Sequence, residues 1–253
     1  MRDTAKQSAG TVTFDQAEHQ VRCEWGLRGL RELAPVSEIL IIVDVLSFTT
    51  ALDIGTARGA IIFPYPLNDP SAATYAAAFH ARLASVGRQA GFSLSPASLE
   101  SLPAGYRLVL PSPNGAALAF AAGHHQIVLA ACLRNAGAVA RMAASLGATF
   151  AVIPAGETWP TGELRPSLED LIGAGAVIAS LPGNRSPEAE LAAASFERFR
   201  AGPAGALRQS SSGKELIERG FGRDVELAAE CDVSVNVPRL LDRAFVSCVS
   251  RLA

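Results

Sequence analysis

The chain has 253 residues, of which 49% are hydrophobic and 18% charged, and its formal net charge at pH 7 is −2. Such a chain can form one large domain or two small ones around a sizeable core. The charge gives no electrostatic support to nucleic-acid binding or to an anionic membrane surface, so we expect neither as a partner. No apolar stretch has the length of a signal peptide or of a membrane span, and we therefore expect a cytoplasmic protein.

Strands and helices are predicted to alternate through the first two thirds of the chain, after a polar and frayed segment at 1–13. Apolar runs predict strands at 20–24, 39–43, 60–63, 107–110, 126–131 and 149–153. Helical patterns fall at 29–33, 51–59, 72–84, 116–122 and 136–146. This alternation is typical of βαβ units with right-handed crossovers. The sequence therefore predicts an α/β fold with three α/β/α layers and a largely parallel or mixed sheet.

The last third is predicted to be mainly helical. A helix is expected over 165–181, where Ser167 can cap the first turn and Asp170 stands three residues later. A second helix should begin at Ser186 and run to about Phe199. A loop at 201–214, a short helix at 215–219 and a strand at 233–237 complete the prediction. No low-complexity linker or clear domain boundary interrupts the chain.

The strand predicted at 39–43 ends on Asp44. Its lack of polar alternation predicts burial on both faces. Ligands of open α/β sheets bind beyond the carboxyl ends of the strands, so Asp44 and the hydroxyls of Ser47 and Thr49 are candidate site residues. Capping of the following helix is an equally good explanation of Asp44.

Three predicted turns, at 112–115, 133–136 and 210–214, have the composition of anion-binding helix N-termini. The alternative is that Gly, Ser and Asn stand there for conformational reasons. The third turn resembles a P-loop, but Arg208 replaces a required glycine and Glu215 replaces the Ser or Thr that follows the lysine. Binding of a nucleoside triphosphate is therefore not expected.

Four acids are predicted near strand ends or helix starts: Asp44, Glu157, Glu169 and Asp170. Carboxylates together with a phosphate are the usual ligands of Mg²⁺. Because the sequence has no cluster of histidines or cysteines, an oxygen-bound metal is the kind that it supports. A capping box explains Asp170 equally well, and Glu169 could be a solvated helix residue. Arg134 and Arg165 are candidates for bidentate anion binding, although most arginines are surface charges.

Short segments spread over nearly the whole chain carry a family resemblance: VDVLSFTT at 43–50, LSPASL at 94–99, PNGAALA at 113–119, ACLRNAGAVA at 131–140, LEDLIGAGA at 168–176, SSGKELIERGFGRDVELAA at 211–229 and VSVNVP at 233–238. In this order they resemble the 2-phosphosulfolactate phosphatases of the ComB type. The resemblance implies a single phosphatase domain over 1–253 and Mg²⁺-dependent hydrolysis of 2-phospho-3-sulfolactate to 3-sulfolactate and phosphate. It also implies a link to coenzyme M biosynthesis.

Two positions depart from the family pattern. Ser47 stands where a basic residue is usual and Ala116 where threonine is usual, which indicates a subgroup with LSFTT in place of LRATT. The substrate could thus be another small phosphorylated hydroxy acid, or the chain could be a non-catalytic binder of small anions. The oligomeric state stays open, a homodimer included.

The residues and the resemblance together assign roles to a set of side chains. The assigned catalytic residues are Asp44, Asn114, Arg134, Asn135, Arg165 and Glu169. The assigned binding residues for a small anionic phosphoester are Ser47, Thr49, Gly115, Ser211, Ser212, Gly213 and Lys214. The assigned Mg²⁺ ligands are Asp44, Glu169 and Asp170.

Overall fold

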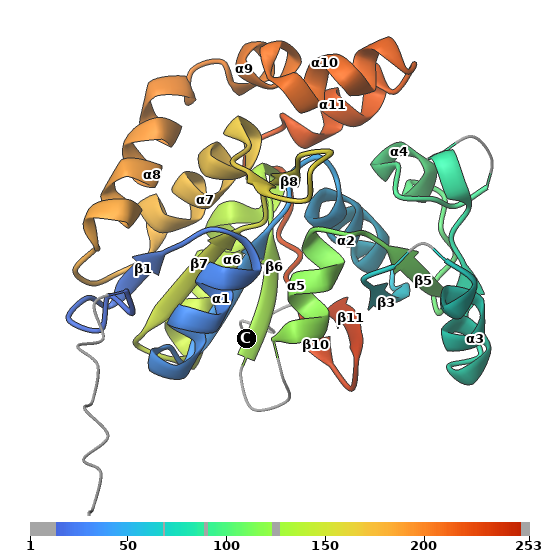
Figure 1. Ribbon diagram of the computed structural model, residues 1–253, viewed down its shortest axis with the longest axis horizontal. Coiled ribbons are helices and arrows are strands. Elements are labelled where there is room, and N and C mark those ends of the chain that lie inside the picture. The colour runs from blue at the N-terminus through green and yellow to red at the C-terminus, as the bar shows by residue number, and fades with distance from the viewer. Residues whose placement is uncertain (1–13, 68, 89–90, 123–126, 249–253) are drawn as a thin grey trace, which may run out of the picture.

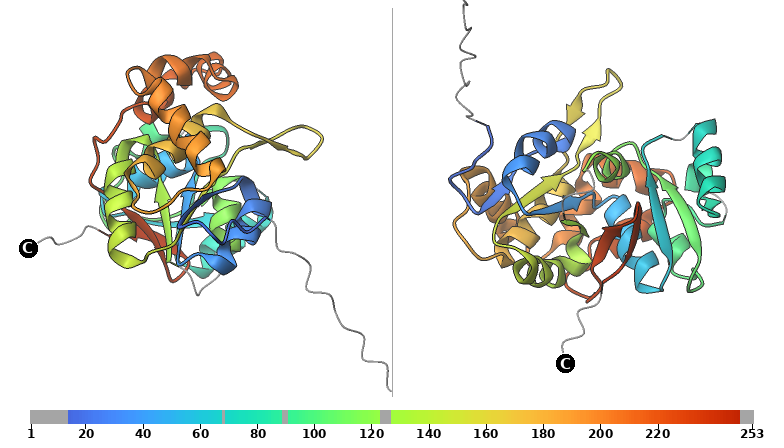
Figure 2. Two further views of the ribbon diagram at one scale, coloured as in Figure 1. Left: turned by 90° about the vertical axis from the view of Figure 1, so that its left-hand side faces the viewer. Right: turned by 90° about the horizontal axis from the view of Figure 1, so that it is seen from below.

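The computed structural model describes residues 14–67, 69–88, 91–122 and 127–248. Within these ranges the core is a nine-stranded sheet in the order β1-β7-β2-β6-β10-β11-β3-β5-β4. Its strands are β1 (Val21–Cys23), β2 (Ile39–Val43), β3 (Ile61–Tyr65), β4 (Arg82–Leu83), β5 (Arg107–Pro111), β6 (Ile127–Ala131), β7 (Phe150–Pro154), β10 (Pro238–Leu241) and β11 (Ala244–Ser247). A separate two-stranded hairpin, β8 (Glu157–Thr158) and β9 (Leu164–Arg165), projects from the body of the molecule (Figure 2).

The sheet is mixed because one antiparallel hairpin is inserted between two parallel parts. β2 pairs in parallel with β6 and β7, and β3 pairs in parallel with β5. Between these parts the hairpin β10–β11 pairs antiparallel with β6 on one side and with β3 on the other. The predicted α/β fold with a parallel or mixed sheet is therefore confirmed.

Helices cover both faces of the sheet. Successive side chains of β2 point to opposite faces, so Ile41 packs with the helices α6 (Ala136–Leu146), α7 (Leu168–Ser180) and α8 (Pro187–Phe199). Ile42 packs on the other face with α1 (Gly26–Leu33), α2 (Phe48–Ala57) and α5 (Gly115–Ala121). All five β2 residues are buried, which explains why the strand has no polar alternation. The three layers expected from the sequence are thus present.

The remaining helices lie at the margins of these layers. Three of them, α9 (Pro203–Gln209), α10 (Ser211–Glu218) and α11 (Gly222–Ala228), stand together at the top of the molecule in Figure 1. The others are α3 (Pro70–Ala78), α4 (Pro96–Leu99) and the 3-10 turns η1 (Ala34–Val36), η2 (Val86–Arg88) and η3 (Leu133–Asn135). None of the helices in the described ranges is both long and apolar enough to cross a membrane.

Three predictions of local structure are wrong. The loop expected at 201–214 is instead α9 and the first turn of α10, which Ser210 caps by accepting a hydrogen bond from the Gly213 N–H at 3.1 Å. The helix expected at 72–84 ends at Ala78 and is followed by β4. The strand expected at 233–237 is irregular, because its backbone bonds to the η3 turn: the Ser234 N–H donates to the Arg134 carbonyl at 2.9 Å. Two other expectations, at 1–13 and Gln126, lie outside the described residues.

Candidate active site

A pocket of about 190 Å³ lies beyond the carboxyl ends of β2, β5 and β7, and α10 forms its opposite wall. The loop after β2 contributes Asp44 and Ser47, and the turn after β5 contributes Asn114. The full lining consists of Asp44, Leu46, Ser47, Leu94, Ser112, Pro113, Asn114, Glu157, Ser212, Glu215, Leu216 and Arg219. This is the position in which open α/β sheets bind their ligands.

Asp44 is buried and holds two helix N-termini together. Its Oδ1 accepts a hydrogen bond from the Phe48 N–H at 3.1 Å, and its Oδ2 accepts one from the Gly115 N–H at 2.8 Å. The Ser112 hydroxyl donates to Oδ2 at 3.5 Å. Both sequence interpretations therefore apply, since Asp44 caps α2 and α5 and also lines the pocket. Backbone N–H donors at both oxygens favour the charged carboxylate.

Gly115 is required where it stands because it approaches Asp44 so closely. A Cβ at this position would lie 2.5 Å from Phe48 Cδ1 and 2.6 Å from Asp44 Oδ2. We expect Gly115→Ala to push the carboxylate aside, to cost about 1–3 kcal/mol of folding stability, and to lower kcat. Thermal unfolding and steady-state kinetics would check this. Gly202→Ala is the control, because nothing lies within 4 Å of the Cβ position at Gly202. Gly105→Ala is not suitable as a control, because Gly105 has a positive φ.

Glu157 lines the pocket together with Asp44 and has a perturbed pKa. Its Oε2 accepts a hydrogen bond from Asn114 Nδ2 at 2.8 Å, and the Thr158 hydroxyl donates to Asn114 Oδ1 at 3.3 Å. Burial, and after it the negative charge of Asp44, raise the pKa of Glu157 to about 7. In the sequence Glu157 was one of four candidate acids and had no assigned role. The signal that pointed to it is its place directly after the Pro154-Ala155-Gly156 end of β7.

Asp170 accepts hydrogen bonds that connect the loops of the site. Its Oδ1 accepts from the Val45 N–H at 2.7 Å, while its Oδ2 accepts from the Gly156 N–H at 2.9 Å and from the Ser167 hydroxyl at 2.7 Å. Burial, followed by the charges of Asp44 and Glu169, raises the pKa of Asp170. Asp170 does not line the pocket. It fixes the segments after β2 and β7 against the first turn of α7.

The predicted metal ligands Asp44, Glu169 and Asp170 are buried and lie near enough for the charges of Asp44 and Glu169 to raise the pKa of Asp170. Among the residues that the structure describes, no three His, Cys, Asp or Glu side chains form a group placed to hold a metal ion, and the metal role of Asp44, Glu169 and Asp170 stays a prediction. Two carboxylates that line the pocket, Asp44 and Glu157, would be enough to hold Mg²⁺. This ion often binds only one or two carboxylates and completes its coordination shell with water and substrate phosphate. The mutual repulsion of Asp44 and Glu157, visible in the raised pKa of Glu157, is what a cation between them would relieve.

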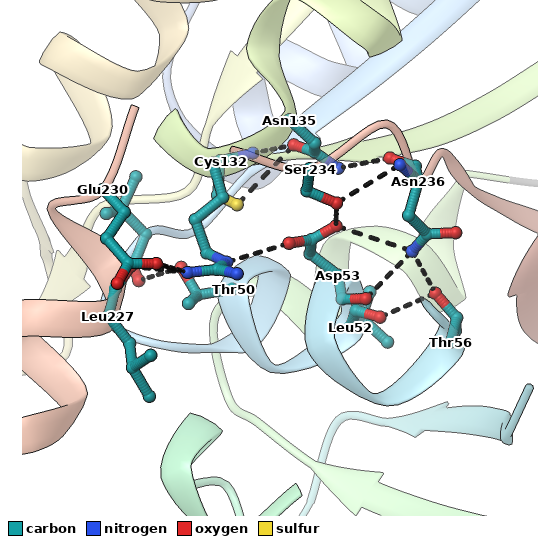
Figure 3. Close-up of polar contacts among 12 residues, drawn as sticks. Thr50, Leu52, Asp53, Thr56, Cys132, Asn135, Leu227, Glu230, Ser234 and Asn236 are labelled. Carbon is teal, nitrogen blue, oxygen red and sulfur yellow. Dashed lines mark hydrogen bonds and ion pairs between the residues drawn. The ribbon is translucent and has the colours of Figure 1, made fainter. Parts of the chain in front are cut away.

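Arg134 lies outside the pocket lining and takes part in a polar network around Asp53, which Figure 3 shows. Its Nε donates to Asp53 Oδ2 at 3.0 Å, and its Nη1 donates to the Leu227 carbonyl at 3.2 Å and to the Glu230 carboxylate. Asp53 also accepts from the Ser234 hydroxyl at 2.6 Å. The structure thus does not bring Arg134 together with the pocket residues.

Asn135 and the predicted anion-binding turn at 133–136 belong to the same network. Asn135 Oδ1 accepts from the Cys132 N–H at 2.9 Å, and its Nδ2 donates to the Asn236 carbonyl at 3.1 Å (Figure 3). Nearby, the Gly137 N–H donates to Asp232 Oδ1 at 2.8 Å. A protein carboxylate therefore occupies the position in which the sequence predicted a ligand anion.

The remaining assigned residues divide between the pocket and its support. Ser47 is buried in the pocket lining, whereas the Thr49 hydroxyl is held by Asp44, donating to the Asp44 carbonyl at 2.7 Å. Ser212 lines the pocket and accepts a hydrogen bond from Arg165 Nη2 at 3.0 Å. The Arg165 guanidinium carbon also lies 5.5 Å from the centre of the Trp159 ring, so Arg165 joins the β8–β9 hairpin to α10.

The turn at 210–214 is the first part of α10 and not an open loop. Ser211 and Lys214 are exposed and do not line the pocket. Gly213 serves packing, since a Cβ there would lie 1.8 Å from the Leu207 carbonyl oxygen. Two lining residues, Glu215 and Arg219, received no role from the sequence, although both lie within the helix predicted at 215–219, because their exposure to the pocket depends on how α10 packs.

Comparisons with known proteins agree with this geometry. A family model described as 2-phosphosulpholactate phosphatase matches residues 29–243. A protein of Carboxydothermus hydrogenoformans named "probable 2-phosphosulfolactate phosphatase" is 29% identical over 207 residues, which is 79% of this chain and 84% of that protein. Proteins of the same name from Gloeobacter violaceus and Deinococcus radiodurans are 34% and 31% identical, over 54% and 60% of this chain and 56% and 64% of their own lengths. The chain therefore belongs to the 2-phosphosulpholactate phosphatase family and is a phosphatase that acts on a phosphate monoester.

Proposed function

We propose that this phosphatase hydrolyses 2-phospho-3-sulfolactate to 3-sulfolactate and phosphate, and that Mg²⁺ is required. The observation that carries the proposal is the pair of pocket carboxylates, Asp44 and Glu157, at the carboxyl ends of β2 and β7. The names of the relatives support the substrate. A link to coenzyme M biosynthesis would follow from the same reaction.

Different residues of the pocket would bind the cation and the phosphate group of the substrate. Asp44 and Glu157 would hold the cation, which when bound supplies positive charge to the phosphoryl oxygens and lowers the pKa of a bound water. The Asp44 carboxylate is positioned by hydrogen bonds from the N–H groups of Phe48 and Gly115. The Ser212 hydroxyl already accepts a hydrogen bond from Arg165, so its own proton can be donated to a phosphate oxygen. Asn114 orients Glu157 through the 2.8 Å hydrogen bond.

A phosphate-release assay tests the proposal. The purified protein would be supplied with 2-phospho-3-sulfolactate, 2-phospholactate, phosphoglycolate and p-nitrophenyl phosphate, each with Mg²⁺ and with a chelator. We expect the largest kcat/KM for phosphosulfolactate and loss of turnover on chelation. A higher kcat/KM for 2-phospholactate would favour a different phosphorylated hydroxy acid as the substrate. Absence of turnover with every ester would contradict the proposed activity, and retained anion binding in calorimetry would then favour a non-catalytic binder of small anions.

Cation binding should also depend on pH in a way that needs no assay of activity. Because the pKa of Glu157 is about 7, protonation removes one carboxylate ligand below that pH. We therefore expect Mg²⁺ to raise the Tm of the wild type more at about pH 8 than at about pH 6. In Glu157→Gln, Mg²⁺ should raise the Tm only slightly at both pH values. An equal shift in the wild type at both would mean that Glu157 does not hold the cation.

A further inference from the structure

The α10 wall of the pocket presents a face of its own. Ser212, Glu215, Leu216 and Arg219 all line the pocket, and their spacing of three, four and seven residues places them on one side of the helix. Asp44 and Glu157 lie at the opposite, strand-end wall. Among the lining residues in the described chain, Arg219 carries the positive charge. The pocket therefore has an acidic wall and a wall with one guanidinium.

The present partner of Arg219 can be replaced by a ligand. Arg219 Nη1 lies 2.9 Å from Glu215 Oε1, one helical turn away, and the two side chains are 49% and 63% exposed. An exposed ion pair of this kind contributes little free energy, since water competes for both groups. The guanidinium carbon also lies 5.8 Å from the centre of the Phe221 ring, which limits where the side chain can go. An anion in the pocket can thus take the place of Glu215 without a large cost.

The two arginines that the sequence suggested for anion binding are already engaged. Arg134 is bound to Asp53 and Glu230 inside the protein, and Arg165 donates to Ser212. Ser47, at the base of the pocket, is uncharged. A substrate that bears a second anionic group besides its phosphate would therefore meet Arg219 as the cationic side chain of the pocket lining. The planar fork of a guanidinium suits the paired oxygens of a carboxylate or a sulfonate.

We propose that Arg219 is a specificity-determining residue that binds the second anionic group of the substrate, and that Glu215 is the carboxylate which this group displaces. The inference rests on the proposed function, because it takes the phosphoryl group to lie at the Asp44 and Glu157 wall. It assigns recognition of the second anionic group to Arg219 on the α10 side of the pocket, while Ser212 of the same helix serves the phosphoryl group. Arg219 is then a binding residue, and the reaction at phosphorus does not depend on it.

Three variants test the proposal: Arg219→Gln, Glu215→Gln and, as a matched control, Arg208→Gln. Arg208 also forms an exposed ion pair, with Glu226 at 3.4 Å, and lies outside the pocket lining. Each would be assayed with 2-phospho-3-sulfolactate, with 2-phospholactate, which keeps only the carboxylate, with the phosphate ester of 2-hydroxyethanesulfonate, which keeps only the sulfonate, and with p-nitrophenyl phosphate, which has neither.

We expect Arg219→Gln to raise KM about tenfold to a hundredfold for each ester whose extra anionic group contacts Arg219, with little change in kcat. The KM for p-nitrophenyl phosphate should stay within about twofold of the wild-type value. Glu215→Gln should lower KM for the anionic esters, because it removes the competing carboxylate. The group that Arg219 binds, carboxylate or sulfonate, is the one carried by the ester whose KM rises more in Arg219→Gln. Arg208→Gln should behave as the wild type.

The proposal would be overturned if Arg219→Gln raised KM equally for p-nitrophenyl phosphate and for the anionic esters. It would also be overturned if the KM values of all these esters were unchanged. Titration calorimetry with 3-sulfolactate, which carries no phosphate, separates this inference from the proposed function. If the wild type hydrolyses no ester, the proposed function fails, yet weaker sulfolactate binding by Arg219→Gln than by Arg208→Gln would still support the role of Arg219. Equal binding by the two variants would refute it.

Discussion

Asp44→Asn is expected to lower kcat by about a hundredfold to ten-thousandfold. Asp44 is the pocket carboxylate that accepts backbone hydrogen bonds at both oxygens, from the N–H groups of Phe48 and Gly115. The amide keeps the size of the side chain and removes the charge that the cation and the attacking water require. Steady-state phosphate release at saturating Mg²⁺ measures the loss.

The same change has a separate and smaller effect on folding. The asparagine NH₂ group would face one of the two backbone N–H donors, so one hydrogen bond is lost at a cost of about 1–3 kcal/mol. Urea unfolding would show this, and kcat must be measured well below the midpoint. Asp69→Asn is the matched control, since Asp69 caps α3 by accepting from the Ser71 N–H at 2.9 Å and asparagine caps equally well. A folded Asp44→Asn variant with wild-type kcat would leave Asp44 as a helix cap alone.

Arg134→Gln should give the largest loss of stability, about 3–5 kcal/mol, with kcat little changed below the unfolding temperature. The side chain of Asp53 is 1% exposed, and the variant leaves this carboxylate inside the protein without its cation. Arg134 does not line the pocket, so chemistry there does not depend on it directly. Chemical denaturation of Arg134→Gln and of Arg208→Gln, each against the wild type, measures the two losses of folding stability. Arg208→Gln removes an exposed ion pair and should cost about 1 kcal/mol or less.

The loss caused by Arg134→Gln should grow with pH. Burial already raises the pKa of Asp53 above its ordinary value, and removing Arg134 takes away a positive charge that opposes this rise. A carboxyl group whose folded pKa exceeds its unfolded pKa contributes its full stability below the unfolded pKa and loses it as the pH rises through the folded pKa. The difference from the wild type should therefore be smaller at about pH 5 than at about pH 8. A large loss of kcat in a stable Arg134→Gln protein would instead support the catalytic role that the sequence predicted.

Features set by short-range patterns could be predicted from the sequence. β2 and α6 begin and end at the predicted residues, because the apolar run at 39–43 and the helical pattern at 136–146 are each bounded by polar or turn-forming residues. The Ser186 cap of α8 was also predicted, and its hydroxyl oxygen accepts from the Ala189 N–H at 3.1 Å. The position of Asp44 beyond a buried strand followed from the same local pattern.

The sequence did not reveal how the C-terminal segment is used. The residues at 233–237 have a β-branched pattern, yet they bond to η3 and to α2, where Asn236 Nδ2 donates to the Asp53 carbonyl at 2.9 Å. These contacts also settle the environment of Arg134, whose partner Asp53 comes from another helix. A β propensity favours an extended chain but does not specify a sheet partner, because the partner depends on long-range packing.

The composition of the pocket was likewise decided by tertiary structure. Asp44 could be placed at the site from its neighbours in sequence, whereas Glu157, Glu215 and Arg219 line the pocket because β7 lies beside β2 and α10 packs across the strand ends. Asp170 shows the converse, since its carboxylate resembles a metal ligand in the sequence, yet it lies outside the pocket lining and accepts hydrogen bonds from Val45, Gly156 and Ser167. Local sequence therefore determined which carboxylates stand near strand ends in this protein. Only the folded chain decided which of them line the pocket, because this depends on how segments far apart in the sequence pack against one another.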